Sequence, residues 1–155
     1  MHVYLIQHGD AVEESVDPER PLSKKGITDI EAVGHFLEKA HISVLAIWHS
    51  GKTRARQTAE RLASHLTDTP AIEEKHGLNP HDKPRVIFKE LQSHTGDVAI
   101  VGHLPHLAAF AAELLTDDEE TDLVAFQKGC VVCLERDKTE RWRVKWMVIP
   151  SLLTP

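Results

Sequence analysis

The sequence predicts an α/β fold, a three-layer α/β/α sandwich around a mostly parallel sheet of about five or six strands. Short, continuously apolar runs, typical of strands buried on both faces, alternate along the chain with segments whose apolar residues recur every three or four positions. This alternation predicts parallel strands joined by helices that cover both faces of the sheet. The 155 residues contain no internal repeat, linker or low-complexity tract, so we expect a single domain over residues 1–155.

The first third of the chain begins with an apolar run at residues 3–7, which predicts a short buried strand. Residues 13–21 are charged and contain two prolines, which indicates a loop. Ser23 can cap a helix that runs to about residue 40. The apolar residues of this helix lie on one expected inner face: Ile27, Ile30, Val33, Phe36 and Leu37.

Residues 44–48 predict a second buried strand, and Ser50 is then placed to cap a helix to about residue 66. A short strand is expected at 71–73 and a loop at 76–82, where glycine, asparagine and proline gather. The inner face of the second helix is expected to consist of Ala55, Ala59, Leu62 and Leu66.

The rest of the chain continues the alternation. Asp82 can cap a third helix that ends near residue 94, and Pro84 fits its opening turn. The inner face of this helix is expected to consist of Val86, Ile87 and Leu91. The remaining expected elements are a strand at 98–101, a helix at 105–115, an acidic loop at 117–120, and strands at 130–135 and 142–148 joined by a turn. In the last strand Trp142, Val144, Trp146 and Val148 alternate, which predicts one packed face.

Composition narrows the possible partners and location. The formal net charge of −6 argues against nucleic acid as a main partner, although an acidic protein can still carry a locally positive pocket. No signal peptide is visible, and no apolar run approaches the roughly 18 residues that a membrane helix needs. The two cysteines, Cys130 and Cys133, lie in an expected strand and indicate neither a disulfide framework nor a redox pair. We therefore expect a cytoplasmic protein without membrane contact.

Two histidines follow buried strands and neighbour a glycine. His8 precedes Gly9, and His103 follows Gly102. Ligands of open α/β sheets bind at the carboxyl ends of strands, so both rings are candidates for phosphoryl chemistry. His103, before a helix start, could act there as a cation or as a neutral donor. The alternatives are a strand-end histidine bonded to a carbonyl and a helix cap. His106 completes a His-x-x-His pair, but no third ligand is evident, and we expect no metal.

Arg54 lies in the first turn of the helix after Ser50. The helix dipole does not favour a cation at this end, so an arginine there either faces solvent or serves an anion. Its planar fork matches the oxygens of a phosphate. Arg56 points to roughly the opposite side and is expected to pair with Glu60.

In this order, and each at an element junction, these motifs resemble those of the histidine phosphatase superfamily, which has the phosphoglycerate-mutase-like fold, and most of all its short SixA-type phosphohistidine phosphatases. The resemblance covers nearly the whole chain. Its motifs are residues 8–11, 20–26, 50–59 and 101–105.

The resemblance implies a role for each matching residue. His8 would be the nucleophile that becomes phosphorylated, His103 the second catalytic histidine, and Arg54 a phosphate-binding arginine. No metal or organic cofactor is implied. The expected phosphate- and substrate-binding residues are Gln7, Gly9, Arg20, Ser50 and Gly102.

Two departures from the family pattern affect the expected chemistry. The opening motif has Gln7 where the family has arginine, and losing one charged hydrogen bond costs about 1.5–3 kcal/mol, which corresponds to a roughly ten- to hundred-fold slower reaction. Residues 75–80 offer no carboxylate where larger members carry an acidic catalyst. A departing imidazole needs less protonation than an alkoxide, which favours phosphohistidine as substrate. The candidates for a proton donor remain Asp10, Asp17, His81 and Asp82.

We therefore expect a SixA-type phosphohistidine phosphatase that acts on a phosphorylated histidine of a protein, such as a phosphotransfer domain in a signalling relay. Two alternatives stay open: a phosphatase for small phosphoesters, and a phosphate-binding module with little turnover because of Gln7. The oligomeric state also stays open, with a monomer as the default.

Overall fold

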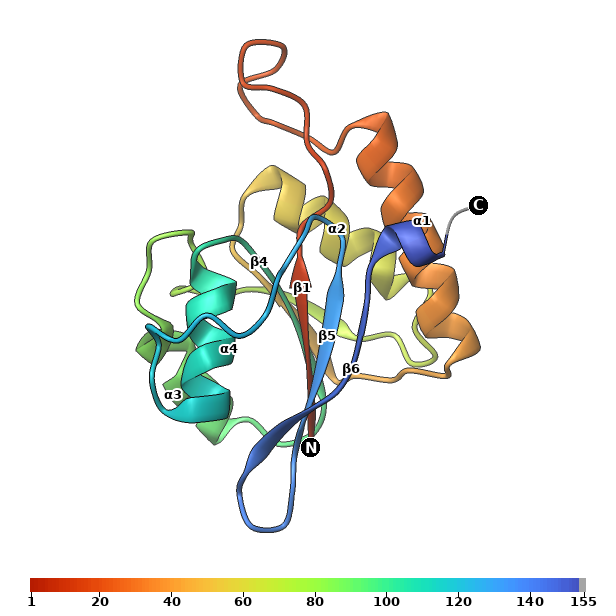
Figure 1. The fold of residues 1–155 in the computed structure, drawn as a ribbon. Coiled ribbons are helices and arrows are strands. Elements are labelled where there is room, and N and C mark those ends of the chain that lie inside the picture. Colours follow the sequence, from red (N-terminus) through yellow and green to blue (C-terminus); the bar gives the residue numbers. More distant parts are fainter. Residues whose placement is uncertain (154–155) are drawn as a thin grey trace.

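The computed structural model of the chain describes residues 1–153, so the last two positions of the expected domain lie outside it. Strands and helices alternate as predicted (Figure 1). The strands are β1 (His2–Gln7), β2 (Ala46–His49), β3 (Ala71–Glu74), β4 (Val98–Gly102), β5 (Val131–Arg136) and β6 (Trp142–Val148). The helices are α1 (Lys24–Lys39), α2 (Thr53–Ala63), α3 (Pro84–Ser93), α4 (His106–Thr116) and the short 3₁₀ helix η1 (Pro150–Leu152).

All six strands form one sheet in the order β3-β2-β4-β1-β5-β6, which confirms the predicted mostly parallel sheet. Strands β3, β2, β4 and β1 run parallel to one another, whereas β5 pairs antiparallel with both β1 and β6, to which a hairpin joins it. Gln7 of β1 is in register with Gly102 of β4, and His49 of β2 is in register with Val101. The carboxyl ends of these three strands therefore meet at one edge of the sheet.

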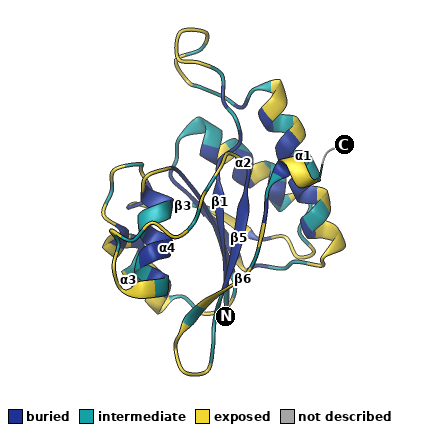
Figure 2. Cartoon of the chain, in the orientation of Figure 1, coloured by how far each residue is buried: buried dark blue, intermediate teal, exposed yellow. Residues whose placement is uncertain are grey.

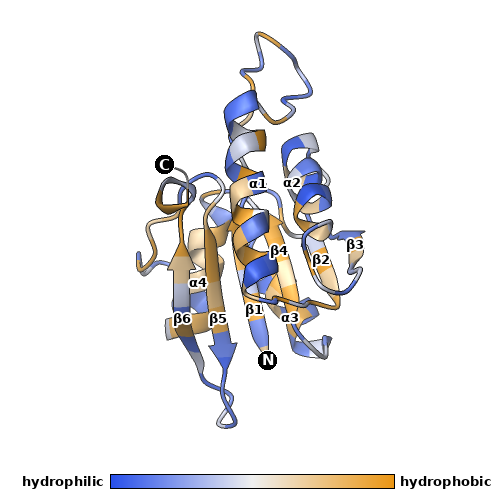
Figure 3. Cartoon of the chain, turned by 90° about the vertical axis from the view of Figure 1, so that its right-hand side faces the viewer, coloured by the Kyte–Doolittle hydropathy of each residue, from blue (hydrophilic) through white to orange (hydrophobic). Residues whose placement is uncertain are grey.

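The helices cover both faces of the sheet, so the chain has the three layers that the sequence predicts (Figures 1 and 3). Alternate residues of β1 show the division: Val3 and Leu5 pack with α3 and α4, whereas Tyr4 and Ile6 pack with α1 and α2. The central strands are buried on both sides, while much of β6 is exposed (Figure 2). Within the described residues, no helix is long and apolar enough to cross a membrane.

Two predicted helix caps are wrong. Ser23 caps α1 as expected, because its side chain accepts a hydrogen bond from the Gly26 amide. Helix α2, however, begins after Lys52 rather than Ser50, and α3 begins after Lys83 rather than Asp82. Both polar side chains form other hydrogen bonds. Ser50 bonds to the distant His103, and Asp82 accepts from the Asn79 amide in its own loop.

The alternation predicted for the last strand is also wrong. Strand β6 has one extra residue, Lys145, opposite the Cys133–Leu134 step of β5, and this bulge turns the following side chains over. Trp142 consequently packs against the layer of α3 and α4, whereas Trp146 packs against the layer of α1 and α2. Val144 is half exposed. Val86 of α3, expected inside, is 41% exposed as well, because the buried stripe of this short helix is narrower than predicted.

Candidate active site

The ring of His8 is fixed by the backbone directly after β1. His8 is 7% exposed, and its Nδ1 donates a hydrogen bond of 2.7 Å to the carbonyl oxygen of Gly9. A carbonyl can only accept, so the proton is on Nδ1 and the lone pair is on Nε2. Burial is the largest cause that lowers the pKa of His8 to about 4; the hydrogen bond to the Gly9 carbonyl opposes this shift, and the neighbouring cations add to it. The ring is therefore neutral at pH 7, with Nε2 as its nucleophilic atom.

Arg54 meets this nitrogen from the first turn of α2. Its Nε donates to His8 Nε2 at 3.3 Å, although the two residues are 46 positions apart. Arg54 therefore serves the site and does not merely face solvent. Arg56 points away and pairs with Glu60 at 3.7 Å, as predicted.

His103 lies beside His8, with ring centroids 4.9 Å apart. It is 2% exposed and follows β4, and its Nε2 shares a hydrogen bond of 2.6 Å with Ser50 Oγ. Burial, followed by the charges of neighbouring residues, lowers the pKa of His103 to about 3. The second histidine is therefore neutral at pH 7, and its cationic form, one of the two options that the sequence left open, is not populated in the free protein.

Four cations surround these two rings. Arg54, Lys128 and Arg20 depress the pKa of His8 electrostatically, and Arg54 and Lys52 do the same to His103. A chain of net charge −6 thus has a locally positive edge where β1, β2 and β4 end. Two neutral rings among fixed cations suit the binding of a dianionic phosphoryl group, because its negative charge offsets the positive charge of the cations.

Lys128 is a site residue to which the sequence analysis assigned no role. Its Nζ lies 2.8 Å from Asp10 Oδ1, and the next residue, Gly129, donates its amide to the carbonyl oxygens of Gln7 (3.0 Å) and His8 (3.2 Å). The segment before β5 therefore closes over the end of β1. The pairing joins residues 118 positions apart, and no local pattern in the sequence could have indicated it.

Gly9 lies in a closely packed position between α1 and the loop before it. A Cβ at this position would lie 2.9 Å from Ile30 Cγ1 and 3.0 Å from Leu22 Cδ2. Its amide donates to Thr58 Oγ1 at 3.1 Å, and the Thr58 hydroxyl donates to the Arg54 carbonyl at 2.8 Å. Thr58 thereby ties α2 to the loop after His8, a positioning role that the sequence analysis missed.

The remaining predicted residues contribute less directly. Gln7 is 7% exposed, and its Oε1 is buried with no hydrogen-bond partner among residues 1–153. The carbonyl oxygen of Gly102 accepts a hydrogen bond of 3.1 Å from the His8 amide. Arg20 adopts a left-handed backbone (φ 46°) and donates from Nε to the Val12 carbonyl at 3.1 Å.

Of the four candidate proton donors, Asp10 is the one whose charge state the structure defines. Hydrogen bonds from Lys128 and Ser23 lower the pKa of Asp10, which is therefore an anion at neutral pH. Asp17 and Asp82 accept backbone hydrogen bonds within their own loops, at 3.0 Å from Glu19 and 2.9 Å from Asn79. His81 is exposed.

An anchored, neutral imidazole nitrogen among cations is a candidate nucleophile for phosphorus, and such a site at the strand ends of an α/β fold is typical of phosphatases. A model of the histidine phosphatase superfamily (branch 1) matches residues 3–79. An uncharacterized protein of Picosynechococcus sp. is 31% identical over 119 residues, covering 72% of this chain and 71% of the relative. The chain belongs to the histidine phosphatase superfamily, whose members are phosphatases.

Solved structures share the whole fold. The protein histidine phosphatase SixA complexed with tungstate superimposes with a TM-score of 0.87 at 24% identity, covering 99% of this chain and 100% of that one. A candidate phosphohistidine phosphatase SixA from Agrobacterium tumefaciens gives 0.81 at 21% identity, with 96% and 97% covered. The predicted phosphoglycerate-mutase-like fold is thereby confirmed.

Proposed function

We propose that this chain is a SixA-type phosphatase that removes the phosphoryl group from a phosphorylated histidine of a partner protein, such as a phosphotransfer domain in a signalling relay. The observation that carries the proposal is the state of His8: its Nδ1 is anchored on the Gly9 carbonyl, and its unprotonated Nε2 faces Arg54. The likeness in fold to SixA supports the choice of substrate.

In the first step, His8 Nε2 attacks phosphorus and the P–N bond of the substrate breaks. A substrate ring that is protonated on its other nitrogen leaves as neutral imidazole. Phospho-His8 then carries the proton on Nδ1 and the phosphoryl group on Nε2, and the Gly9 carbonyl stabilises the resulting imidazolium. Arg54 and Lys128 bind the phosphoryl oxygens, whose charge is spread in the transition state.

In the second step, water attacks the phosphorus of phospho-His8 and the new P–N bond breaks. The two protons of the water stay with the phosphate, which leaves as H₂PO₄⁻, and His8 returns to its neutral form. The cations near His8 stabilise the same oxygens in both steps. Ser50 holds the neutral ring of His103 beside the ring of His8 throughout both steps.

The electrostatics of the site favour phosphohistidine over phosphoesters. An alkoxide leaving group needs a proton in the transition state, whereas an imidazole leaving group does not. The candidate donor nearest to His8, Asp10, is an ionised partner of Lys128 and holds no proton at pH 7. A site without a carboxylic acid can therefore cleave a phosphoramidate more readily than an ester.

The test is release of phosphate from a ³²P-labelled phosphohistidine protein, followed beside a panel of phosphoesters. We expect faster turnover of the phosphohistidine protein, an alkali-stable label on the parent chain, and neither turnover nor label in His8→Asn. His76→Ala, which alters an exposed histidine on another loop, is the matched control and is expected to behave like the parent.

Three outcomes would change the conclusion. Equal turnover by parent and His8→Asn would exclude the covalent mechanism. Preference for phosphoesters would reverse the order of the two enzymatic functions. Tight binding of the phosphorylated partner without turnover would indicate the phosphate-binding module instead.

A further inference from the structure

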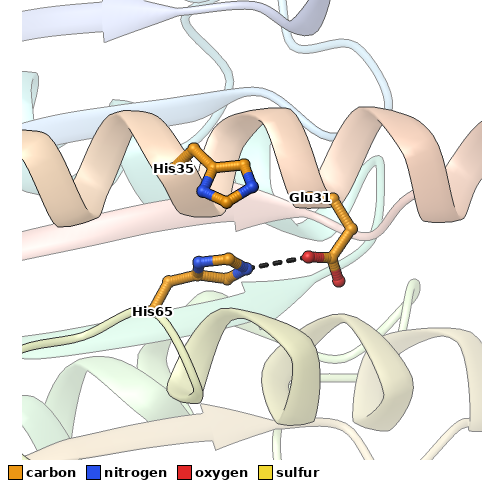
Figure 4. Close-up of side chains that lie close together, drawn as sticks. All are labelled: Glu31, His35 and His65. Atoms are coloured by element: carbon orange, nitrogen blue, oxygen red, sulfur yellow. Dashed lines mark hydrogen bonds and ion pairs between the residues drawn. The ribbon is translucent and has the colours of Figure 1, made fainter.

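A second cluster of histidines lies on the outer layer, away from His8. Glu31 and His35 are four residues apart on α1, and His65 follows the end of α2. One ligand atom from each residue lies within 4.8 Å of the other two (Figure 4). Glu31 and His65 are half-buried and His35 is exposed, so the cluster is open to solvent. The sequence analysis took these histidines as exposed and expected no metal cluster among them.

A second carboxylate, that of Glu38, lies close to both rings. Glu38 Oε2 lies 3.4 Å from His35 Nδ1 and 3.6 Å from His65 Nδ1. Histidines that bind metals usually donate their other ring N–H to a carboxylate or carbonyl, which fixes the tautomer. Glu38 is placed to do this for both rings at once, which leaves both Nε2 atoms as ligands.

Glu31 supplies the third ligand as an anion. Its Oε2 accepts from His65 Nε2 at 2.8 Å, and its Oε1 accepts from Arg61 at 3.1 Å. Arg61 occupies one oxygen, so Glu31 offers only Oε2 to a cation. Coordination of a cation by His65 Nε2 would require the ring proton to be on Nδ1, which lies 3.6 Å from Glu38 Oε2.

The backbone is shaped to let His65 reach α1. A Cβ on Gly34 would overlap the His65 ring at Cδ2, so only glycine at this position allows the ring to lie against the helix. The carbonyl end of α2, where His65 sits, also favours a positive charge. The histidine is thus positioned by two independent features outside the cluster itself.

We propose that Glu31, His35 and His65 form a site for one divalent transition-metal ion of the zinc class, which joins α1 to α2. Two imidazoles and one carboxylate are a donor set typical of Zn²⁺ with an open position for water. At 1.5 Å per helical residue, Ala63 at the end of α2 lies roughly 14 Å along the helix from Arg54, and His65 follows this end, so the site is separate from the phosphatase site. Its occupancy would hold together the two helices that cover one face of the sheet.

The test is titration of the full chain with ZnCl₂, followed by calorimetry and thermal unfolding. We expect one saturable ion per chain and a higher Tm when the ion is bound. His35→Ala is expected to weaken binding at least tenfold and to abolish the Tm shift. Glu38→Gln, which keeps all three ligands, is expected to weaken binding roughly tenfold. His76→Ala is the matched control and is expected to leave Zn²⁺ affinity unchanged.

The same titration distinguishes the proposed site from metal binding at the phosphatase site. His35 is 63% exposed, so its loss leaves the fold intact and the variant remains informative. Binding that survives His35→Ala but is lost in His8→Asn would assign the ion to the phosphatase site and overturn the proposal. The absence of saturable binding by the parent chain would overturn it as well. Neither result bears on whether the chain releases phosphate.

Discussion

Ser50 Oγ lies 2.6 Å from His103 Nε2, although the two residues are 53 positions apart in the chain. One follows β2 and the other follows β4, and these strands are hydrogen-bonded neighbours. The bond holds the His103 ring beside His8, so the second histidine is oriented before any substrate arrives.

Ser50→Ala is expected to lower kcat about tenfold. The change removes the hydrogen bond that orients the His103 ring. Losing one hydrogen bond costs about 1 kcal/mol, which corresponds to somewhat less than a factor of ten in rate. The loss of ring orientation adds to this effect. Steady-state kinetics on a phosphohistidine protein measures the effect. Ser93→Ala, in an exposed helix end, is the control. A kcat unchanged in Ser50→Ala would show that the bond has no part in turnover.

The activity of the parent chain is expected to persist well below pH 6. The nucleophile is the neutral form of His8, whose pKa is lowered to about 4. Since kcat/KM reports groups of the free protein, its acid limb should fall near pH 4 and not near 6.5, the value of an unperturbed histidine. An acid limb at about 6.5 would contradict the buried, neutral His8 described above.

Stability is expected to decrease as pH falls from 7 to 5. His8 and His103 have folded pKa values of about 4 and 3, below the unfolded value of 6.5, so only the unfolded chain takes up their protons in this range. The free energy of unfolding should therefore fall by up to about 2 kcal/mol per histidine. Urea unfolding at both pH values measures it. His8→Asn should remove up to about 2 kcal/mol of this dependence, and an unchanged slope in that variant would contradict the assignment.

Gln7→Arg is expected to raise kcat/KM by roughly ten- to a hundred-fold. Arginine would add a charged hydrogen bond to the phosphoryl group, worth about 1.5–3 kcal/mol. Gln7→Met is the control, because the Gln7 Oε1 has no hydrogen-bond partner among the described residues. No gain in turnover by Gln7→Arg, together with tight binding of a phosphorylated partner, would favour the phosphate-binding module.

The sequence predicts well where the strands and helices lie along the chain, because buried strands and amphipathic helices leave strong local patterns. Every strand and helix appears near its predicted place. His8, Arg54 and His103 were found because each stands at an element junction, and a parallel sheet brings such junctions to one edge.

What the sequence could not provide depends on distant contacts. Ser50 has the local signature of a helix cap, and only the sheet shows that His103 competes for its hydroxyl. Lys128 reaches Asp10 from the far end of the chain, and His65 reaches Glu31 across two helices. The bulge at Lys145 leaves no trace in the alternation of β6, since every other residue remains apolar.

That bulge has a consequence for how the chain meets other copies of itself. Strand β6 is an outer strand of the sheet and carries exposed Val144 and Met147, which could invite a further strand to add by backbone pairing. The extra residue breaks the even spacing of its outward amides and carbonyls, and Lys145 places an ammonium group there. A second strand cannot form a regular set of backbone hydrogen bonds across such a kink, so the irregular edge of β6 disfavours fibrous self-association.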